Sequence, residues 1–97
     1  MPTYVSLIKW TDQGIRAAKD TVSRYEQARA QVERMGGRLS TTYWTQGSYD
    51  IVAISEFPDE ESAMGFLLGL GMQGNLRTET LRAFSAEEMQ RIFQKMS

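Results

Sequence analysis

The chain has 97 residues, 41% of them hydrophobic, and its 11 basic and 12 acidic residues give a net charge of -1. This length fits one domain, residues 1–97, with a small core that association with another chain would help to stabilise. The balanced charge argues against nucleic acid as a partner, and no apolar run approaches the roughly 20 residues of a membrane span. Because the N-terminus also lacks the features of a signal peptide, we expect a cytoplasmic protein.

Cysteine and histidine are both absent from the sequence. A disulfide, a thiol nucleophile and a Ser-His triad are therefore excluded within the chain. A zinc or iron site would have to use carboxylates alone, which is uncommon, so we predict no metal and no cofactor. Any general acid or base must be Asp, Glu, Lys or Tyr.

Strand and helix signals alternate from the start of the chain. Residues 3–10 are rich in Tyr, Val, Ile and Trp and predict a strand. Residues 11–12 offer a helix cap, and the helix either begins there or is broken near residues 20–21. Apolar side chains recur at helical spacing from residue 22 to residue 35. Two glycines at 36–37 end the helix, since glycine accepts the left-handed conformation.

A series of basic residues with glutamates between them begins in this helix and continues just past its end. This pattern is typical of a solvated helix face. The basic residues are Arg24, Arg29, Arg34 and Arg38.

A hairpin occupies the middle of the chain. Residues 39–45 carry Thr and aromatic side chains and predict the second strand. Residues 46–47, Gln-Gly, predict a hairpin turn, and residues 49–57 predict the third strand. Pro58 ends that strand, because proline cannot donate a hydrogen bond to the sheet.

The last part of the chain predicts a helix, a strand and a second, shorter helix. Asp59 caps the first of these helices, which ends in a glycine-rich segment, and residues 75–84 form the fourth strand. Ser85 and Glu88 have the spacing of a capping box at the start of the C-terminal helix. The apolar stripe of that helix consists of Met89, Ile92, Phe93 and Met96.

The predicted order βαββαβ, with an appended helix, indicates an α+β protein. Two βαβ units joined by a hairpin form a ferredoxin-like fold with a four-stranded antiparallel sheet, and right-handed crossovers place the first and third strands in its middle. In the third strand Ile51, Ala53 and Phe57 alternate with Val52 and Ile54, so both faces are apolar. Helices cover one face, and we expect a second copy to cover the other, giving a homodimer or a higher homo-oligomer.

Three segments, residues 4–14, 47–53 and 74–84, resemble the GYD-domain family of small bacterial and archaeal proteins. The family is named for three residues that are here Gly47, Tyr49 and Asp50. The resemblance implies a ferredoxin-like domain of the dimeric α+β barrel type. It implies little about chemistry, because related barrels include cofactor-free monooxygenases, isomerases and amino-acid-sensing domains.

Asp50 is a carboxylate at the entrance of an apolar strand, where a charge needs a partner. A structural pairing with Arg77 or Arg82 of the fourth strand is one interpretation. The functional interpretation is a general base, or an anchor for a ligand hydroxyl or amine, with an arginine free to bind a ligand carboxylate.

Aromatic and hydroxyl side chains near the strand ends complete the candidate site. Aromatic residues there usually close a core or an interface, and threonine is a good strand former, so structural roles are the alternative. The predicted ligand contacts are Asp50, Arg77, Trp10, Tyr49 and Thr78.

Three functions are compatible with these residues. We expect a homodimer that binds a small organic ligand in the barrel or in a helix-sheet cleft. One alternative is a cofactor-independent monooxygenase- or isomerase-like enzyme with Asp50 as base, which needs a water-excluded cavity beside Asp50. The other is an oligomerisation or interaction module without a ligand, whose cavity would admit only water.

Overall fold

The computed structural model describes all 97 residues, and its element order is the predicted one. The predicted first helix is divided into two α-helices and a short 3-10 turn. In chain order the elements are β1 (Thr3–Trp10), α1 (Asp12–Arg16), η1 (Ala18–Asp20), α2 (Thr21–Arg34), β2 (Arg38–Trp44), β3 (Ile51–Glu56), α3 (Glu60–Met72), β4 (Leu76–Ala83) and α4 (Ala86–Met96).

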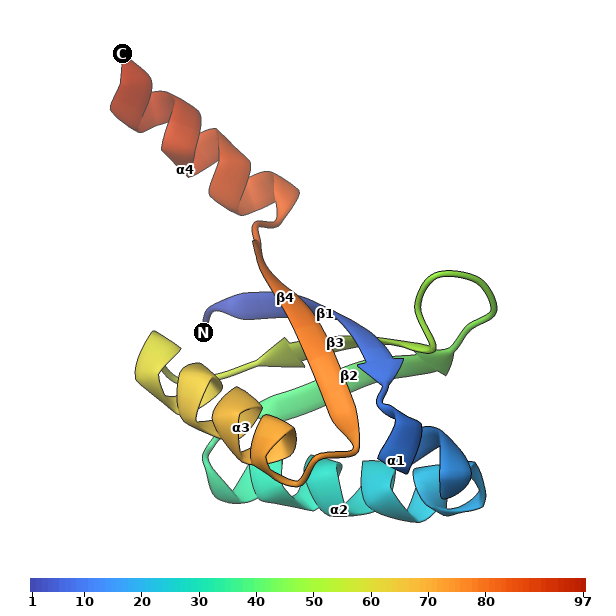
Figure 1. Ribbon diagram of the computed structural model, residues 1–97. Helices are drawn as coiled ribbons and strands as arrows, with labels where there is room; N and C mark the ends of the chain where they lie inside the picture. Colours follow the sequence, from blue (N-terminus) through green and yellow to red (C-terminus); the bar gives the residue numbers. More distant parts are fainter.

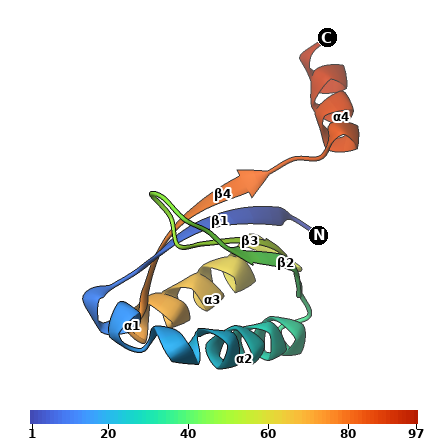
Figure 2. The ribbon, with the colours of Figure 1, turned by 90° about the vertical axis from the view of Figure 1, so that its right-hand side faces the viewer.

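The four strands form one antiparallel sheet in the order β2-β3-β1-β4, with β1 and β3 in the middle as predicted. Helices α2 and α3 lie side by side against one face, which we call the inner face (Figure 1). No helix covers the opposite, outer face (Figure 2). The prediction of an α+β, ferredoxin-like fold is therefore confirmed.

The start of α1 is tied to the start of β4. The Thr11 side chain accepts a hydrogen bond from the Gly14 amide at 3.1 Å, and the Thr11 amide donates to the Asn75 carbonyl at 3.1 Å. A Cβ at position 14 would collide with that carbonyl, so the close approach requires glycine. These contacts hold one end of the helical layer against the sheet.

Strands β2 and β3 form the predicted hairpin, and the connection between them is the loop of residues 45–50. Gly47 has a φ of 105°, a conformation that favours glycine. The Thr45 amide donates to the Asp50 carbonyl at 2.8 Å and closes the loop. This loop carries Tyr49 and Asp50 to the end of β1.

The core lies between the inner face and the helices. Nine of the 97 residues are buried, so this core is thin for a chain of this length. Phe57 is only 2% exposed, and its ring lies 6.1 Å from that of Tyr4 and 5.5 Å from that of Phe66. The other large side chain that is fully buried is Val32 of α2, in the same cluster.

Helix α4 projects away from the rest of the protein (Figures 1 and 2). Its capping box is confirmed: the Ser85 hydroxyl accepts from the Glu88 amide at 3.1 Å, and the Glu88 carboxylate accepts from the Ser85 amide at 2.9 Å. The apolar stripe stays largely uncovered, with Phe93 57% and Met96 76% exposed. None of the helices combines the length and the apolar character that crossing a bilayer requires.

Candidate functional site

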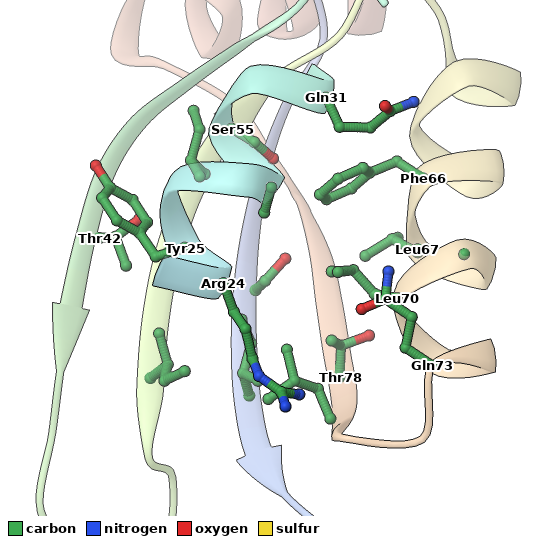
Figure 3. A pocket seen from close by; sticks show the side chains of 18 of the residues that line it. Arg24, Tyr25, Gln31, Thr42, Ser55, Phe66, Leu67, Leu70, Gln73 and Thr78 are labelled. Carbon is green, nitrogen blue, oxygen red and sulfur yellow. The ribbon is translucent and has the colours of Figure 1, made fainter. Parts of the chain in front are cut away.

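A cavity of about 480 Å³ lies between the inner face of the sheet, α2 and α3. Figure 3 shows the side chains of both helices and of the sheet converging on it. The cavity occupies the space that a continuous core would fill in a more tightly packed domain.

Small side chains in register across the sheet explain the cavity. Thr42, Ala53, Ser6 and Thr80 pair directly with one another across β2, β3, β1 and β4. All four line the cavity, as does Ala28 of α2 on the opposite side. Because the side chains of this row are small, they leave an open space between the sheet and the helices.

Hydroxyl groups lie along the same row of the sheet. The Ser6 and Thr80 oxygens share a hydrogen bond of 3.0 Å. The Thr42 hydroxyl is buried and has no hydrogen-bond partner. A buried polar group without a partner is destabilising, so a polar ligand atom beside Thr42 would remove that cost.

The rest of the cavity wall is mainly apolar. Figure 3 shows Phe66, Leu67 and Leu70 pointing from α3 toward the sheet. Trp10 and neighbouring aliphatic residues form the sheet side. The main apolar lining residues are Ile8, Trp10, Ile51, Phe66, Leu67, Leu70 and Leu76. An apolar enclosure with a few polar groups is the usual character of a small-molecule site.

The charged residues that line the cavity are two arginines of α2, Arg24 and Arg34, and no Asp, Glu or Lys is among them. Histidine is absent from the chain, so the polar part of the wall consists of arginine, tyrosine, amide and hydroxyl groups. A few such groups around an apolar space can orient a bound molecule, which makes the arrangement suited to binding.

The five predicted ligand contacts do not lie together. Trp10 and Thr78 line the cavity, whereas Asp50, Arg77 and Tyr49 do not. Thr78 pairs with Ile8 in the row next to the hydroxyl row. Trp10 and Thr78 thus stay ligand candidates in this cavity, and the role of the other three stays a prediction.

The partner of Asp50 is a backbone amide and neither of the expected arginines. Its carboxylate accepts a hydrogen bond from the Trp10 amide at 2.9 Å, and its own amide donates to the Ile8 carbonyl at 2.8 Å. Arg77 is exposed, and Arg82 lies 3.8 Å from Glu88. Asp50 therefore holds the end of β1, which carries Trp10. It does not border the cavity, as a base acting there would have to.

Tyr49 belongs to a polar group at the edge of the outer face. Its hydroxyl donates to the Glu79 carboxylate at 2.8 Å, and the Lys9 ammonium lies 5.4 Å from its ring centre. The hydrogen bond to Glu79, with the negative charge of that residue, raises the pKa of Tyr49 above its usual value. Tyr49 is thus kept protonated and is a poor proton donor at neutral pH.

The sequence-based interpretation of Arg24 as part of a solvated face is wrong. Arg24 is half-buried and lines the cavity, whereas Arg29 of the same helix is exposed and lies 3.4 Å from Glu33. The signal that distinguishes them is helical spacing, since Arg24 lies one turn before Ala28 on the side facing the sheet. Ser6, Thr42 and the cavity they line were not predicted as a site.

Comparison with known proteins supports the resemblance of the three segments. The chain is 29% identical over 90 residues to a glutamine synthetase and cystathionine beta-lyase binding protein of Thermus thermophilus, covering 92% of this chain and 95% of that protein. It also resembles the crystal structure of TTHA0845 from the same organism, with a TM-score of 0.56 and 26% identity, over 89% of this chain and 96% of that one. The GYD domain family model matches residues 4–93. The chain therefore belongs to the GYD domain family.

Proposed function

We propose that this protein is a homodimer in which each protomer binds a small organic ligand in the cavity between the sheet and the helices. The observation that carries the proposal is the cavity of about 480 Å³ itself, which is within the usual size range of ligand sites. Its mainly apolar walls, with hydroxyl groups on the sheet side, favour an apolar ligand with few polar atoms.

The apolar character of the outer face is the reason for proposing a dimer. Aliphatic side chains from three strands lie there, and Leu81 is 50% exposed. Monomeric proteins rarely leave a large continuous apolar patch in water, so a second sheet is the simplest cover. The aliphatic residues of the outer face are Val5, Leu7, Val52, Ile54 and Leu81.

Filling the cavity tests ligand binding. Gly69 of α3 lines the cavity, and a Cβ there would meet no atom within 4 Å. Gly69→Leu should abolish the thermal stabilisation that wild type shows with an apolar metabolite panel. The variant should still fold, since leucine is a better helix former than glycine.

Gly71→Leu is the matched control. Gly71 lies in the same helix with the same open surroundings, but it does not line the cavity. This variant should keep the stabilisation by ligands. If no compound of the panel stabilises wild type, or if Gly69→Leu responds as wild type does, the cavity is not a ligand site.

A second candidate function is binding of a partner enzyme. It is supported by the name of the Thermus relative, a glutamine synthetase and cystathionine beta-lyase binding protein. Helix α4, with its uncovered apolar stripe, is the surface that we assign to such a partner. Phe93→Ser should then abolish co-sedimentation with the glutamine synthetase of the source organism. If the variant still co-sediments with the enzyme, or if the wild-type protein does not, the assignment is contradicted.

A further inference from the structure

We propose that the cavity ligand is an apolar carboxylate whose carboxylate group is bound by Arg24. This inference rests on the proposed ligand-binding function and adds the chemical class of the ligand. Four observations carry it: the position of Arg24, its lack of an acidic partner, the absence of acidic groups from the cavity wall, and the contrast with Arg34.

Arg24 is placed to bind an anion at one end of the cavity. Its side chain leaves α2 and points toward the end at which Thr78 and Gln73 lie (Figure 3). It is half-buried, and it takes part in none of the four ion pairs of the protein. A guanidinium removed in part from water gains most from a carboxylate, which it can bind through two parallel hydrogen bonds.

The position of Arg24 within α2 strengthens this argument. The helix begins at Thr21, and its first turn contains no acidic residue. Asp20 precedes the helix but forms no ion pair with Arg24. A cation near a helix N-terminus is unfavourable, whereas an anion there is stabilised by the helix dipole. A bound carboxylate would therefore interact favourably with both Arg24 and the end of the helix.

Arg34, the other arginine that lines the cavity, is already engaged. It is exposed, and its guanidinium donates to the Gln31 side chain at 2.6 Å. Ten residues separate it from Arg24, which is about 15 Å along a helix. One free guanidinium at one end of an apolar space fits a single carboxylate with an apolar body.

The wall also excludes a positively charged ligand group. None of the lining residues is acidic, so an ammonium inside the cavity would have no counter-charge. Free amino acids carry such a group next to their carboxylate. We therefore expect the cavity to discriminate against them in favour of the deaminated acid.

The test compares three compounds that share one apolar body: hydrocinnamate, hydrocinnamyl alcohol and phenylalanine. Calorimetric titration of the wild-type protein at neutral pH should give binding in that order of affinity. Octanoate and its neutral counterpart octanol test whether the cavity prefers a ligand with a straight-chain apolar part to one with an aromatic ring. Arg24→Gln should weaken carboxylate binding by about tenfold, because a hydrogen bond to a charged group typically contributes that much.

Two controls separate this inference from the proposed function. Arg24→Gln should bind the alcohols as wild type does, and Arg34→Gln should keep the preference for the acids. Equal binding of acid and alcohol by wild type would overturn the carboxylate assignment and leave the cavity as a ligand site. Tighter binding of phenylalanine than of hydrocinnamate would overturn it as well. Binding of none of these compounds would overturn the carboxylate assignment, and the response of Gly69→Leu to the metabolite panel decides the proposed function separately.

Discussion

The two faces of the sheet belong to the same strands but meet different surroundings. The inner face alternates small and large side chains and is covered by α2 and α3, with the cavity between the layers. The outer face carries aliphatic residues and charges such as Lys9 and Glu79, and no helix covers it (Figure 2). Because side chains alternate along a strand, one sequence specifies two surfaces, of which only one is completed within the chain.

The largest expected loss of stability follows from a substitution on the inner face. Phe57 is 2% exposed against Tyr4 and Phe66, so Phe57→Ala should lower the free energy of unfolding by about 3–5 kcal/mol. Leu81→Ala, on the outer face, removes a side chain that is 50% exposed and should cost the protomer less than about 1 kcal/mol. Urea unfolding of both variants, at protein concentrations where the proposed dimer dissociates, gives the comparison. Equal losses would mean that the outer face is also covered within the protomer.

The next effect concerns assembly. Ile54 lies on the outer face and pairs with Val5 of the neighbouring strand. Ile54→Arg should convert the proposed dimer to a monomer in sedimentation equilibrium, since an unpaired charge in an apolar interface is strongly unfavourable.

Leu68→Arg is the control for this change. Leu68 is 54% exposed on α3 and does not line the cavity, so the same substitution there should leave the dimer intact. A wild-type protein that sediments as a monomer would contradict the assignment of the outer face to a second copy.

A smaller effect is expected in α4, which lies apart from both faces. Ser85→Ala removes the hydroxyl that accepts from the Glu88 amide and should cost about 1 kcal/mol of helix stability. Amide hydrogen exchange should show the loss in residues 86–96 while the protection of the sheet stays unchanged. Lower protection in β4 would show that α4 supports the body more than its position suggests.

The smallest effect is the acid dependence of the helix caps. The Ser62 amide, which donates to Asp59 at 2.7 Å, holds the pKa of Asp59 below its ordinary value. The Ser85 amide is the main cause that lowers the pKa of Glu88. A lowered pKa means stability that is present above the unfolded-state value, about 4 for a carboxyl, and is lost as the pH falls through the folded-state value.

Acid titration can separate the two caps. Below about pH 4, Asp59→Asn should lose less stability in α3 than wild type does, because its cap does not titrate. Glu88→Gln should behave likewise in α4. Amide chemical shifts of residues 60–63 and 86–89 would follow the two helix starts separately, and an identical acid response of Asp59→Asn and wild type would contradict this account.

The candidate site was predicted only in part. Trp10 and Thr78 lie in the cavity because apolar and strand-forming residues at those positions point inward by simple alternation. Asp50 was expected to meet an arginine, but its partner is the Trp10 amide. Every residue except proline has a backbone amide, so the residue types do not indicate which amide will be the partner of Asp50. Arg24 was assigned to a solvated helix face because it belongs to a series of basic residues interrupted by glutamates.

Local signals determined the element order, the turn at Gly47, the capping box and the two apolar faces of the sheet. Each depends on residues close together in the chain, whose conformational preferences act at short range. The cavity depends on Thr42, Ser6 and Thr80, which come from distant strands and share a row only through the register of the sheet. The existence of the cavity and the inward position of Arg24 became visible only in the folded chain. The register of the sheet and the packing of α2 depend on contacts between residues that are distant in the sequence.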